Sequence, residues 1–390
     1  MKHSWYNRFL VIVIIIMFIG VSSFQSTTVG LNIDISNNEK LLFIPYTISN
    51  TIYVDDDNIE GPWDGTLEHP YQCIKDGVDN TSQGDTVYVF NGTYVERVKI
   101  YTSINLIGEN KNTTIIDADH KQSAVRLEAN NIIVSGFTLR NSGPEEWHDS
   151  GAHLGTMYNR ADYCNIQGNI IIDNFDGIYA LFSTKNIFKN NIILNNKHNG
   201  ITLHGSSGGE NKFLNNTIIN NSNSGIFIYE PTDHLIYGNV IINNGNYGIM
   251  YSSGCTLIRN IIKGHIYGLC DGGAKSRLYL NTIEDNKYGV YTHSKRSIYV
   301  MNNFIGNEYH ATFQRMFRSL GNSWSKNYWE GYSPLKPKEI RGMVAGFRKI
   351  EYDWEPAKEP YNIYEEKNYN FLFLEKFSLL NLLFQRLSIL

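Results

Sequence analysis

An asparagine followed two residues later by isoleucine recurs along the middle of the chain. These asparagines are Asn169, Asn191, Asn216, Asn239, Asn260, Asn281 and Asn303, at intervals of 22, 25, 23, 21, 21 and 22 residues. The partner is isoleucine every time, from Ile171 to Ile305. Each period also has an apolar residue three positions before the asparagine, and most have a Gly-apolar pair seven to ten positions after it. A spacing this regular predicts a structural repeat.

Each period holds three short runs with alternating inward apolar positions, separated by Asn, Gly and Ser. Such runs are typical of β-strands bounded by turns. Three strands in about 22 residues predict the coil of a right-handed parallel β-helix, an all-β fold. A helical solenoid would need about 33 residues or more and a 3.6-residue period, which these runs lack. Because like residues stack on like, a buried asparagine can donate to and accept from its neighbours above and below.

The N-terminus has the pattern of an export signal. MKHSWYNR is basic, Phe9 to Ile19 is apolar, and the small residues GVSS follow. This order is typical of a signal peptide. A membrane span would need about 18 to 25 apolar residues, so we expect cleavage near Ser23, with a retained N-terminal anchor as the alternative. Either interpretation places the folded part outside the cytoplasm.

Composition narrows the class of protein. The 390 residues carry a formal charge of −4, with 42% apolar and 18% charged residues, which describes a globular chain. No concentrated basic face is present, so we exclude nucleic acid as a partner.

Cys164 and Cys255 fall in one column four coils apart, about 19 Å at the spacing of neighbouring strands. A disulfide needs Cα atoms within about 7 Å, so this pair is predicted to be unbridged.

The span from Asn165 to about Asn307 resembles the parallel β-helix repeats of the pectate-lyase-like superfamily, in particular its NosD-like and carbohydrate-binding, sugar-hydrolysis group. Residues 104–119 and 130–141 resemble the family's first coils. Residues 52–96 resemble its N-terminal cap with a short helix, and 322–329 with Asp353-Trp354 resemble its C-terminal closure. The resemblance covers about residues 51–362 and implies the fold. The superfamily includes lyases, hydrolases, epimerases, passive binders and copper-site maturation factors, and fold alone selects none of them.

The predicted organisation follows from the repeat and its flanks. It comprises a signal peptide (1–23), a linker (24–50), the N-terminal cap and first coils (51–120), the β-helix repeats (121–310), the C-terminal closure (311–362) and an amphipathic C-terminal helix (363–390). That helix is expected to pack on the end or flank of the coils, with membrane contact as the alternative. An apolar outer face that includes Ile170, Ile192 and Ile242 is expected to be covered by this helix or by a second subunit, which would make a homo-oligomer.

Side chains on a β-strand alternate between its two sides. The side chains two and four residues after the glycine of each Gly-apolar pair are therefore predicted to point outward and to form a stripe. The predicted substrate-binding residues on it are Tyr179, Thr202, Phe227, Tyr229, Tyr291 and His293. Exposed aromatic rings offer flat faces on which sugars can stack, and such patches mark interaction sites. The stripe therefore predicts binding of a polysaccharide or cell-surface glycan. The alternative is that aromatic residues simply fit β-sheets.

The densest polar cluster supplies candidates for catalysis. The candidate catalytic residues are His204, Glu230, Asp233, His234 and Tyr251, with Arg259 as a possible cation. A lyase or uronate epimerase needs a base, an acid and a cation on the carboxylate, whereas a hydrolase needs two carboxylates. Residues 230–234 are similar in part to the Asp-Pro-His-Asp motif of alginate epimerases. The alternative is that these are ordinary turn residues at coil corners.

Metal chemistry has weaker candidates. His148, Asp149 and His153 lie close together in the insertion after Asn141, but a loop cluster of this size more often binds nothing. The chain has seven methionines and no Met/His-rich tract. We therefore predict no metal site and no cofactor. Three hypotheses remain: a carbohydrate-binding protein, an enzyme acting on acidic glycans, and a NosD-like accessory factor for metalloenzyme maturation.

Overall fold

The computed structural model describes residues 49–144, 149–205, 209–231, 233–316 and 321–364, apart from the side chains of Glu230, Pro231 and Ser253. The predicted signal peptide, nearly all of the linker and residues 365–390 of the predicted C-terminal helix lie outside this part of the chain. The helix's placement and its membrane contact therefore stay predictions. Among the described residues no helix is long and apolar enough to cross a membrane.

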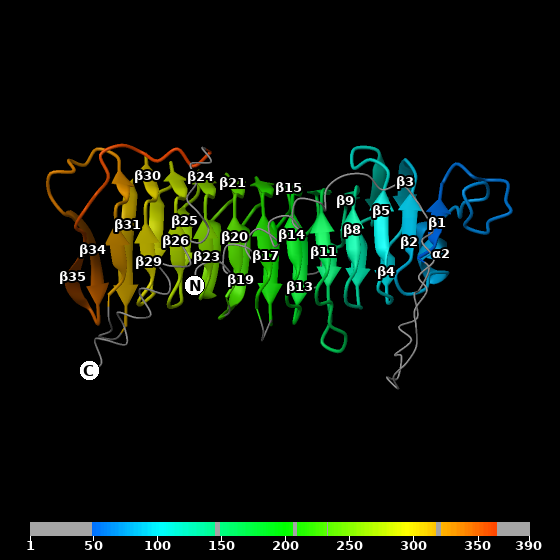
Figure 1. The fold of residues 1–390 in the computed structure, drawn as a ribbon, viewed down its shortest axis with the longest axis horizontal. Coiled ribbons are helices and arrows are strands. Elements are labelled where there is room, and N and C mark those ends of the chain that lie inside the picture. Colours follow the sequence, from blue (N-terminus) through cyan, green and yellow to red (C-terminus); the bar gives the residue numbers. More distant parts are fainter. Residues whose placement is uncertain (1–48, 145–148, 206–208, 232, 317–320, 365–390) are drawn as a thin grey trace, which may run out of the picture. The chain divides into compact units, whose positions relative to one another are not determined.

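The described strands form three parallel ladders, which are the three sides of each coil (Figure 1). Ladder 1 contains β1 (Thr51–Val54), β2 (Thr86–Val89), β5 (Asn105–Gly108), β8 (Ile133–Ser135), β11 (Asn165–Gln167), β14 (Ile187–Lys189), β17 (Lys212–Leu214), β20 (Leu235–Tyr237), β23 (Thr256–Ile258), β26 (Arg277–Tyr279), β29 (Ile298–Val300), β32 (Ser323–Ser325) and β35 (Phe347–Asp353). Ladder 2 contains β3 (Gly92–Val95), β6 (Thr114–Asp117), β9 (Thr138–Arg140), β12 (Ile170–Ile172), β15 (Ile192–Leu194), β18 (Thr217–Ile219), β21 (Val240–Ile242), β24 (Ile261–Lys263), β27 (Thr282–Glu284), β30 (Asn303–Ile305) and β33 (Tyr328–Trp329). Ladder 3 contains β4 (Val98–Ile100), β7 (Val125–Leu127), β10 (Ser150–Leu154), β13 (Asp176–Leu181), β16 (Ile201–His204), β19 (Ser224–Pro231), β22 (Tyr247–Ser253), β25 (Tyr267–Asp271), β28 (Tyr288–Thr292), β31 (Tyr309–Arg315) and β34 (Lys338–Val344). The predicted right-handed parallel β-helix is confirmed.

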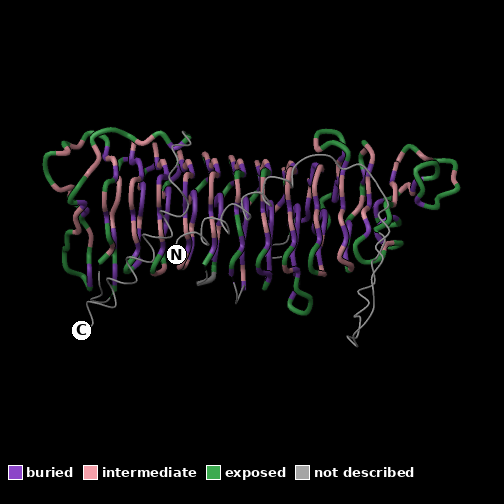
Figure 2. The backbone as a smooth tube through the Cα atoms, in the orientation of Figure 1, coloured by how far each residue is buried: buried purple, intermediate pink, exposed green. Residues whose placement is uncertain are grey.

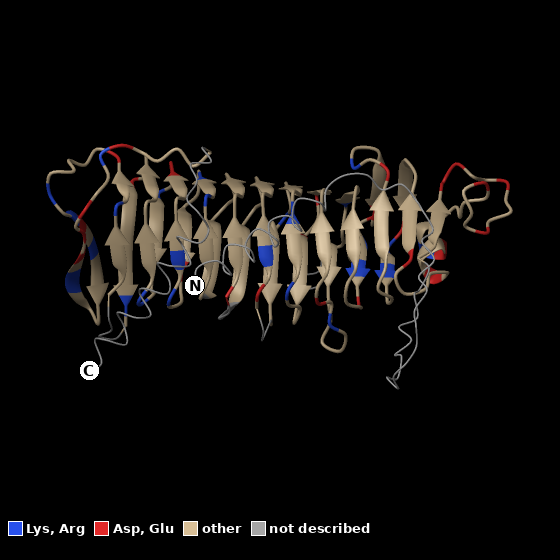
Figure 3. Cartoon of the chain, viewed as in Figure 1, with Lys and Arg blue, Asp and Glu red and all other residues tan. Residues whose placement is uncertain are grey.

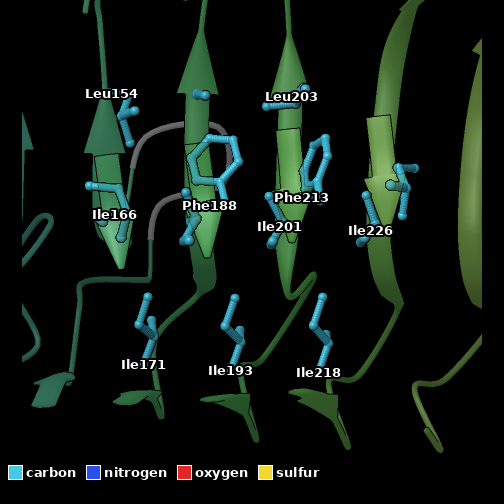
Figure 4. Packing of buried hydrophobic residues seen from close by; sticks show 14 of the residues in the cluster. Leu154, Ile166, Ile171, Phe188, Ile193, Ile201, Leu203, Phe213, Ile218 and Ile226 are labelled. Atoms are coloured by element: carbon cyan, nitrogen blue, oxygen red, sulfur yellow. The ribbon is translucent and has the colours of Figure 1, made fainter. Parts of the chain in front are cut away.

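The core is a stack of identical or similar side chains inside the coils. Ile171, Ile193 and Ile218 are successive partners in ladder 2 and are fully buried, and Figure 4 shows them aligned beneath the Phe188 and Phe213 rings of ladder 1. Along most strands of ladders 1 and 2, buried residues alternate with partly exposed ones, whereas β10 and β13 of ladder 3 are buried throughout (Figure 2). Burying each such side chain stabilises the fold by roughly 1.5 to 3 kcal/mol.

The seventh repeat is shifted by one residue from its predicted register. Ile283 pairs with Phe304, and the buried ladder asparagine of this coil is Asn302. Asn303 and Ile305 lie on the outer side, where Asn303 hydrogen-bonds the backbone of Tyr361. The sequence Asn302-Asn303 offers two candidates, and the larger Phe304 side chain fills the core better than Ile305.

Two columns of asparagine hold the coils together. The first runs from Asn169 to Asn327, and each member's amide nitrogen donates to the side-chain oxygen of the next, as from Asn239 to Asn260 at 3.0 Å. The carboxylate of Asp353 ends this column, because Asn327 and Trp329 donate to it. The second column contains Asn174, Asn196, Asn221, Asn244, His265, Asn286 and Asn307. These bonds satisfy amide groups that would be costly to bury unpaired.

A third column occupies the corner between ladder 3 and ladder 1. It contains Cys164, Asn186, Asn211, His234 and Cys255, linked for example by the bond from the Asn186 backbone nitrogen to Asn211. Neither Cys164 nor Cys255 is part of a disulfide bond, and the same holds for Cys73 and Cys270. The prediction that the Cys164–Cys255 pair is unbridged is confirmed.

The two ends of the described coils differ from the repeats. At the first coils, helix α2 (Ile74–Asp79) buries Ile74 and Val78, and both oxygens of Glu96 accept hydrogen bonds from its first backbone nitrogens. At the last coil, β34 and β35 form an antiparallel hairpin, in contrast to the parallel pairing elsewhere. The hairpin interrupts the repeating register, so the strand edge does not continue as another coil.

Candidate functional site

The outer side of ladder 3 carries the predicted stripe. Strand register aligns one row across neighbouring coils, which contains Tyr179, Thr202, Phe227, Met250, Cys270, Tyr291 and Thr312. A second row lies two residues further along each strand and includes His204 and Tyr229. The rows share one side of the coils, as predicted, but their members differ widely in exposure.

Tyr179 and Thr202 are not exposed, which corrects the prediction for this end of the stripe. Tyr179 is 2% exposed and packs against the His153 ring at 5.2 Å between centroids. Thr202 is 1% exposed, and its hydroxyl group donates to the buried carboxylate of Asp176 at 3.0 Å. Strand alternation gives the side on which a residue lies, but neighbouring side chains decide whether it reaches solvent.

The exposed part of the stripe begins at Tyr229, which is 62% exposed. The His204 ring stacks on it at 5.4 Å and 8°, and Phe227 lies 6.4 Å away at 10°. His204 and Phe227 are half-buried. These three rings form one continuous aromatic surface from two adjacent strands, β16 and β19.

A column of four stacked tyrosines lies on the following coils. Tyr247, Tyr267, Tyr288 and Tyr309 start β22, β25, β28 and β31. Their rings stack at 5.2, 5.1 and 5.0 Å with angles below 20°. Our prediction omitted them, although a Tyr-Gly pair at three successive coils marks the column in the sequence.

A groove of about 290 Å³ lies beside this column and is lined by Tyr229, Tyr247, Tyr267, Tyr291 and His293, among others. The Tyr291 ring meets Tyr267 at 5.5 Å and His293 at 4.9 Å. Burial raises the pKa values of Tyr247 and Tyr291, so their hydroxyl groups remain protonated at neutral pH and can both donate and accept hydrogen bonds. The groove therefore combines ring edges with neutral hydroxyl groups.

The predicted catalytic residues do not form one cluster. His234 is buried in the corner column, where its Nδ1 accepts the Asn211 backbone N–H, and burial lowers its pKa to about 4. Tyr251 lies inside the coils because it pairs with the inward residues Ile228 and Asp271. Neither side chain can touch a substrate on the outer surface, which corrects their predicted roles.

The other candidates are divided between surfaces. His204 lies on the outer side of ladder 3, and Asp233 is exposed in the turn after β19. The side chain of Glu230 lies outside the described residues. Arg259 is at the turn between β23 and β24, on the corner away from ladder 3. Of the described candidates, only His204 and Asp233 are therefore positioned to meet a ligand on this side.

An acidic group lies inside the coils next to Tyr251. Asp271 is fully buried, and it accepts hydrogen bonds from the Tyr299 hydroxyl group at 2.9 Å and the Ser276 hydroxyl group at 3.3 Å. Burial raises the pKa of Asp271 despite these bonds. Because Asp271 is fully buried and bonded to Tyr299 and Ser276, we interpret it as part of the interior packing.

In the part of the chain that the structure describes, the insertion after Asn141 does not form a metal site. Asp149 and His153 are both buried, and His148 lies outside the part of the chain that the structure describes. No group of three or more His, Cys, Asp or Glu side chains in the described ranges is arranged to hold a metal ion.

Comparisons with known proteins agree with the fold. The model of a family described as "Periplasmic copper-binding protein (NosD)" matches residues 78–268. No curated protein matches the sequence. The solved A-module of the Azotobacter vinelandii mannuronan C-5 epimerase AlgE6 is similar, with 17% identity, coverage of 74% of this chain and 95% of that chain, and a TM-score of 0.53.

Two further solved structures are similar. XylC in complex with xylose has 12% identity, coverage of 78% of this chain and 73% of that chain, and a TM-score of 0.53. The Dettilon tailspike protein has 15% identity, coverage of 71% and 62%, and a TM-score of 0.54. Likeness at this identity shows the fold alone. The chain folds as a parallel β-helix, and its residues 78–268 match the model of the NosD family.

Proposed function

We propose that the protein binds a polysaccharide along the outer side of ladder 3. The observation that carries this proposal is the groove of about 290 Å³, which is lined both by Tyr229 and by Tyr247 and Tyr267 of the tyrosine column. Ligand sites are typically concave, mostly apolar and supplied with a few polar groups. The periplasmic description of the NosD family agrees with the predicted export of the chain.

The stacking geometry specifies how a sugar would meet this surface. The faces of Tyr267 and Tyr288 are covered by their neighbours in the column, so these rings present edges and hydroxyl groups. Tyr229 is the most exposed tyrosine beside the groove and offers ring surface for stacking. A linear glycan would therefore stack on Tyr229 and hydrogen-bond to hydroxyl groups repeated once per coil, about every 4.8 Å.

Replacing Tyr229 by alanine should weaken polysaccharide binding roughly tenfold, because one well-placed aromatic contact contributes about 1 to 1.5 kcal/mol. The measurement is affinity gel electrophoresis of the full chain in gels containing polygalacturonate, polymannuronate or galactan. Tyr101→Ala is a matched control, since Tyr101 is 60% exposed and lies near the first coils. Equal retardation of the two variants by every polymer that retards the wild type would contradict the proposal.

Copper binding is a second candidate, favoured by the description of the NosD family. Cu(I) prefers thiolate, thioether and imidazole ligands. Met250 and Cys270 are partners on adjacent strands, and both line the groove together with His293. This donor set fits Cu(I) in type. Burial raises the pKa of Cys270 to about 11, so binding would have to displace the thiol proton.

A competition titration with a coloured Cu(I) chelator tests this candidate. If the groove holds Cu(I), Cys270→Ser and Met250→Leu should each weaken binding by about tenfold or more, the scale of a lost coordination contact. Cys73→Ser is the control, because Cys73 is an exposed thiol far from the groove in the sequence. Wild-type affinity in both groove variants would remove copper binding at this site.

A further inference from the structure

A larger hollow lies at the last coil, between β31 and β34. On β31, only Phe313 to Arg315 pair with β34, so the first halves of these two strands do not pair with each other. The hollow between them has a volume of about 860 Å³, within the range of sites for small ligands. We call this space, which is lined by Tyr309, His310, Lys336, Lys338, Arg341 and Tyr352 among others, the end hollow.

The end hollow is rich in cations. Arg341 forms an ion pair with Glu339 at 2.9 Å, whereas Lys338 has no carboxylate partner among the described residues. The ammonium group of Lys338 lies over the rings of Tyr332 at 4.6 Å and Trp329 at 5.8 Å. Burial, together with the nearby Arg341, lowers the pKa of Lys338. Lys336 adds a further positive charge, Glu308 is the remaining acidic side chain in the lining, and Figure 3 shows the basic segments of the β34–β35 hairpin.

A half-buried cation without a counter-ion favours an anionic ligand, because an anion would replace the hydration that burial removes. The aromatic lining indicates what that anion is attached to. Tyr309 ends the tyrosine column, so one ring face is covered by Tyr288 at 5.0 Å while no following tyrosine covers the other. Tyr309 is 49% exposed and borders the end hollow.

We propose that the end hollow binds a carboxylate-bearing sugar unit, with the carboxylate at Lys338 and Lys336 and the sugar ring against Tyr309. The inference rests on the proposed polysaccharide binding and deepens it by assigning an acidic polymer. The tyrosine column connects the two places, since Tyr247 and Tyr267 line the groove and Tyr309 lines the end hollow. One chain of sugar units laid along the coils would reach both.

The test compares binding of the full chain to polygalacturonate and polymannuronate with binding to the carboxyl-reduced form of each polymer. We expect the wild type to bind an acidic polymer roughly tenfold or more tightly than its reduced form, because one charge-assisted hydrogen bond contributes about that much to affinity. Added salt should decrease this preference. Lys338→Met keeps most of the side-chain length without its charge and should abolish the preference. Lys349→Met, an exposed lysine of β35, should retain it.

The outcomes separate this inference from the proposed function. Equal binding of acidic and reduced polymers, weakened in both cases by Tyr229→Ala, would overturn the acidic assignment and leave polysaccharide binding intact. A preference that survives Lys338→Met would likewise overturn it. Failure of the wild type to bind any of the four polymers would count against both proposals.

Discussion

Lowering the pH from 7 to 4 should destabilise the β-helix through two buried histidines, and His265→Asn should remove about half of their contribution. His265 belongs to the second asparagine column, with its Nδ1 3.0 Å from the Asn286 oxygen and its Nε2 3.2 Å from the Asn244 amide nitrogen. Nδ1 therefore carries the proton and Nε2 accepts. Burial lowers the pKa values of His265 and His234 from 6.5 to about 4.

The direction follows from which state takes up protons first. Because the folded pKa lies below the unfolded value, the unfolded chain is protonated first as the pH falls. The stabilising contribution is complete above about pH 6.5 and is lost between pH 6.5 and 4. At about 1.4 kcal/mol per pKa unit, each histidine contributes roughly 3 kcal/mol. Protonation of Nε2 would also turn the acceptor for Asn244 into a second donor.

Urea unfolding at pH 7 and pH 4 measures this effect. His265→Asn restores the residue type of the neighbouring column positions, so its stability at pH 7 should change little and its acid loss should be about 3 kcal/mol smaller than that of the wild type. Other groups, such as Asp271, whose pKa is raised by burial, change the stability in the opposite direction as the pH falls. Their contribution is the same in both proteins and cancels in the comparison. An identical acid loss in both proteins would contradict this account of His265.

Replacing Asn239 by alanine should cost at least about 3 kcal/mol of folding stability. Its amide nitrogen donates to the Phe213 carbonyl oxygen at 2.9 Å and to Asn260 at 3.0 Å. Its side-chain oxygen accepts from the backbone nitrogen and the amide nitrogen of Asn216, both at 2.9 Å. The truncation leaves buried donors and an acceptor without partners, and each costs about 1 to 3 kcal/mol.

Thermal and urea unfolding, followed by circular dichroism, measure this loss. Asn246→Ala is the matched control in the same coil, because Asn246 is exposed and its side chain makes a single described hydrogen bond, to Asn223. The control should change stability by less than about 0.5 kcal/mol. Similar losses in the two variants would show that the asparagine column does not hold the coils together as we describe.

The repeat period was sufficient to predict the fold, because inward isoleucines and ladder asparagines must recur once per coil. The predicted register was wrong by one residue at Asn303, because the adjacent Asn302 fits the asparagine pattern equally well. The second column, from Asn174 to Asn307, was also present in the sequence, but the substitution of His265 interrupts its asparagine pattern. Spacing thus predicts the architecture better than it predicts the exact register.

The candidate site was less predictable, for two physical reasons. Alternation alone places Tyr251 inside, two residues after the inward Ile249, so the sequence contained that correction. It contained no comparable signal for Tyr179, which is buried although it lies on the outer side of its strand. Exposure depends on contacts between side chains that are distant in sequence, and the period of a strand does not encode those contacts.

Two of the predicted catalytic residues are buried in the described geometry. The acid and base roles proposed for His234 and Tyr251 require contact with substrate, whereas both side chains are buried within the coils. His204 remains on the outer side, where it stacks on Tyr229 at 5.4 Å. We interpret His204 as a ring that supports the orientation of Tyr229 at the surface.

The most direct test of the proposed glycan-binding surface is saturation-transfer NMR with the full chain and soluble polygalacturonate, polymannuronate or galactan fragments. Irradiation of the aromatic protons should transfer saturation to sugar ring protons, because the proposed contacts are with tyrosine rings. The transfer should fall in Tyr229→Ala and persist in Tyr101→Ala. No transfer to any of these fragments, or equal transfer in both variants, would contradict a polysaccharide-binding surface on ladder 3.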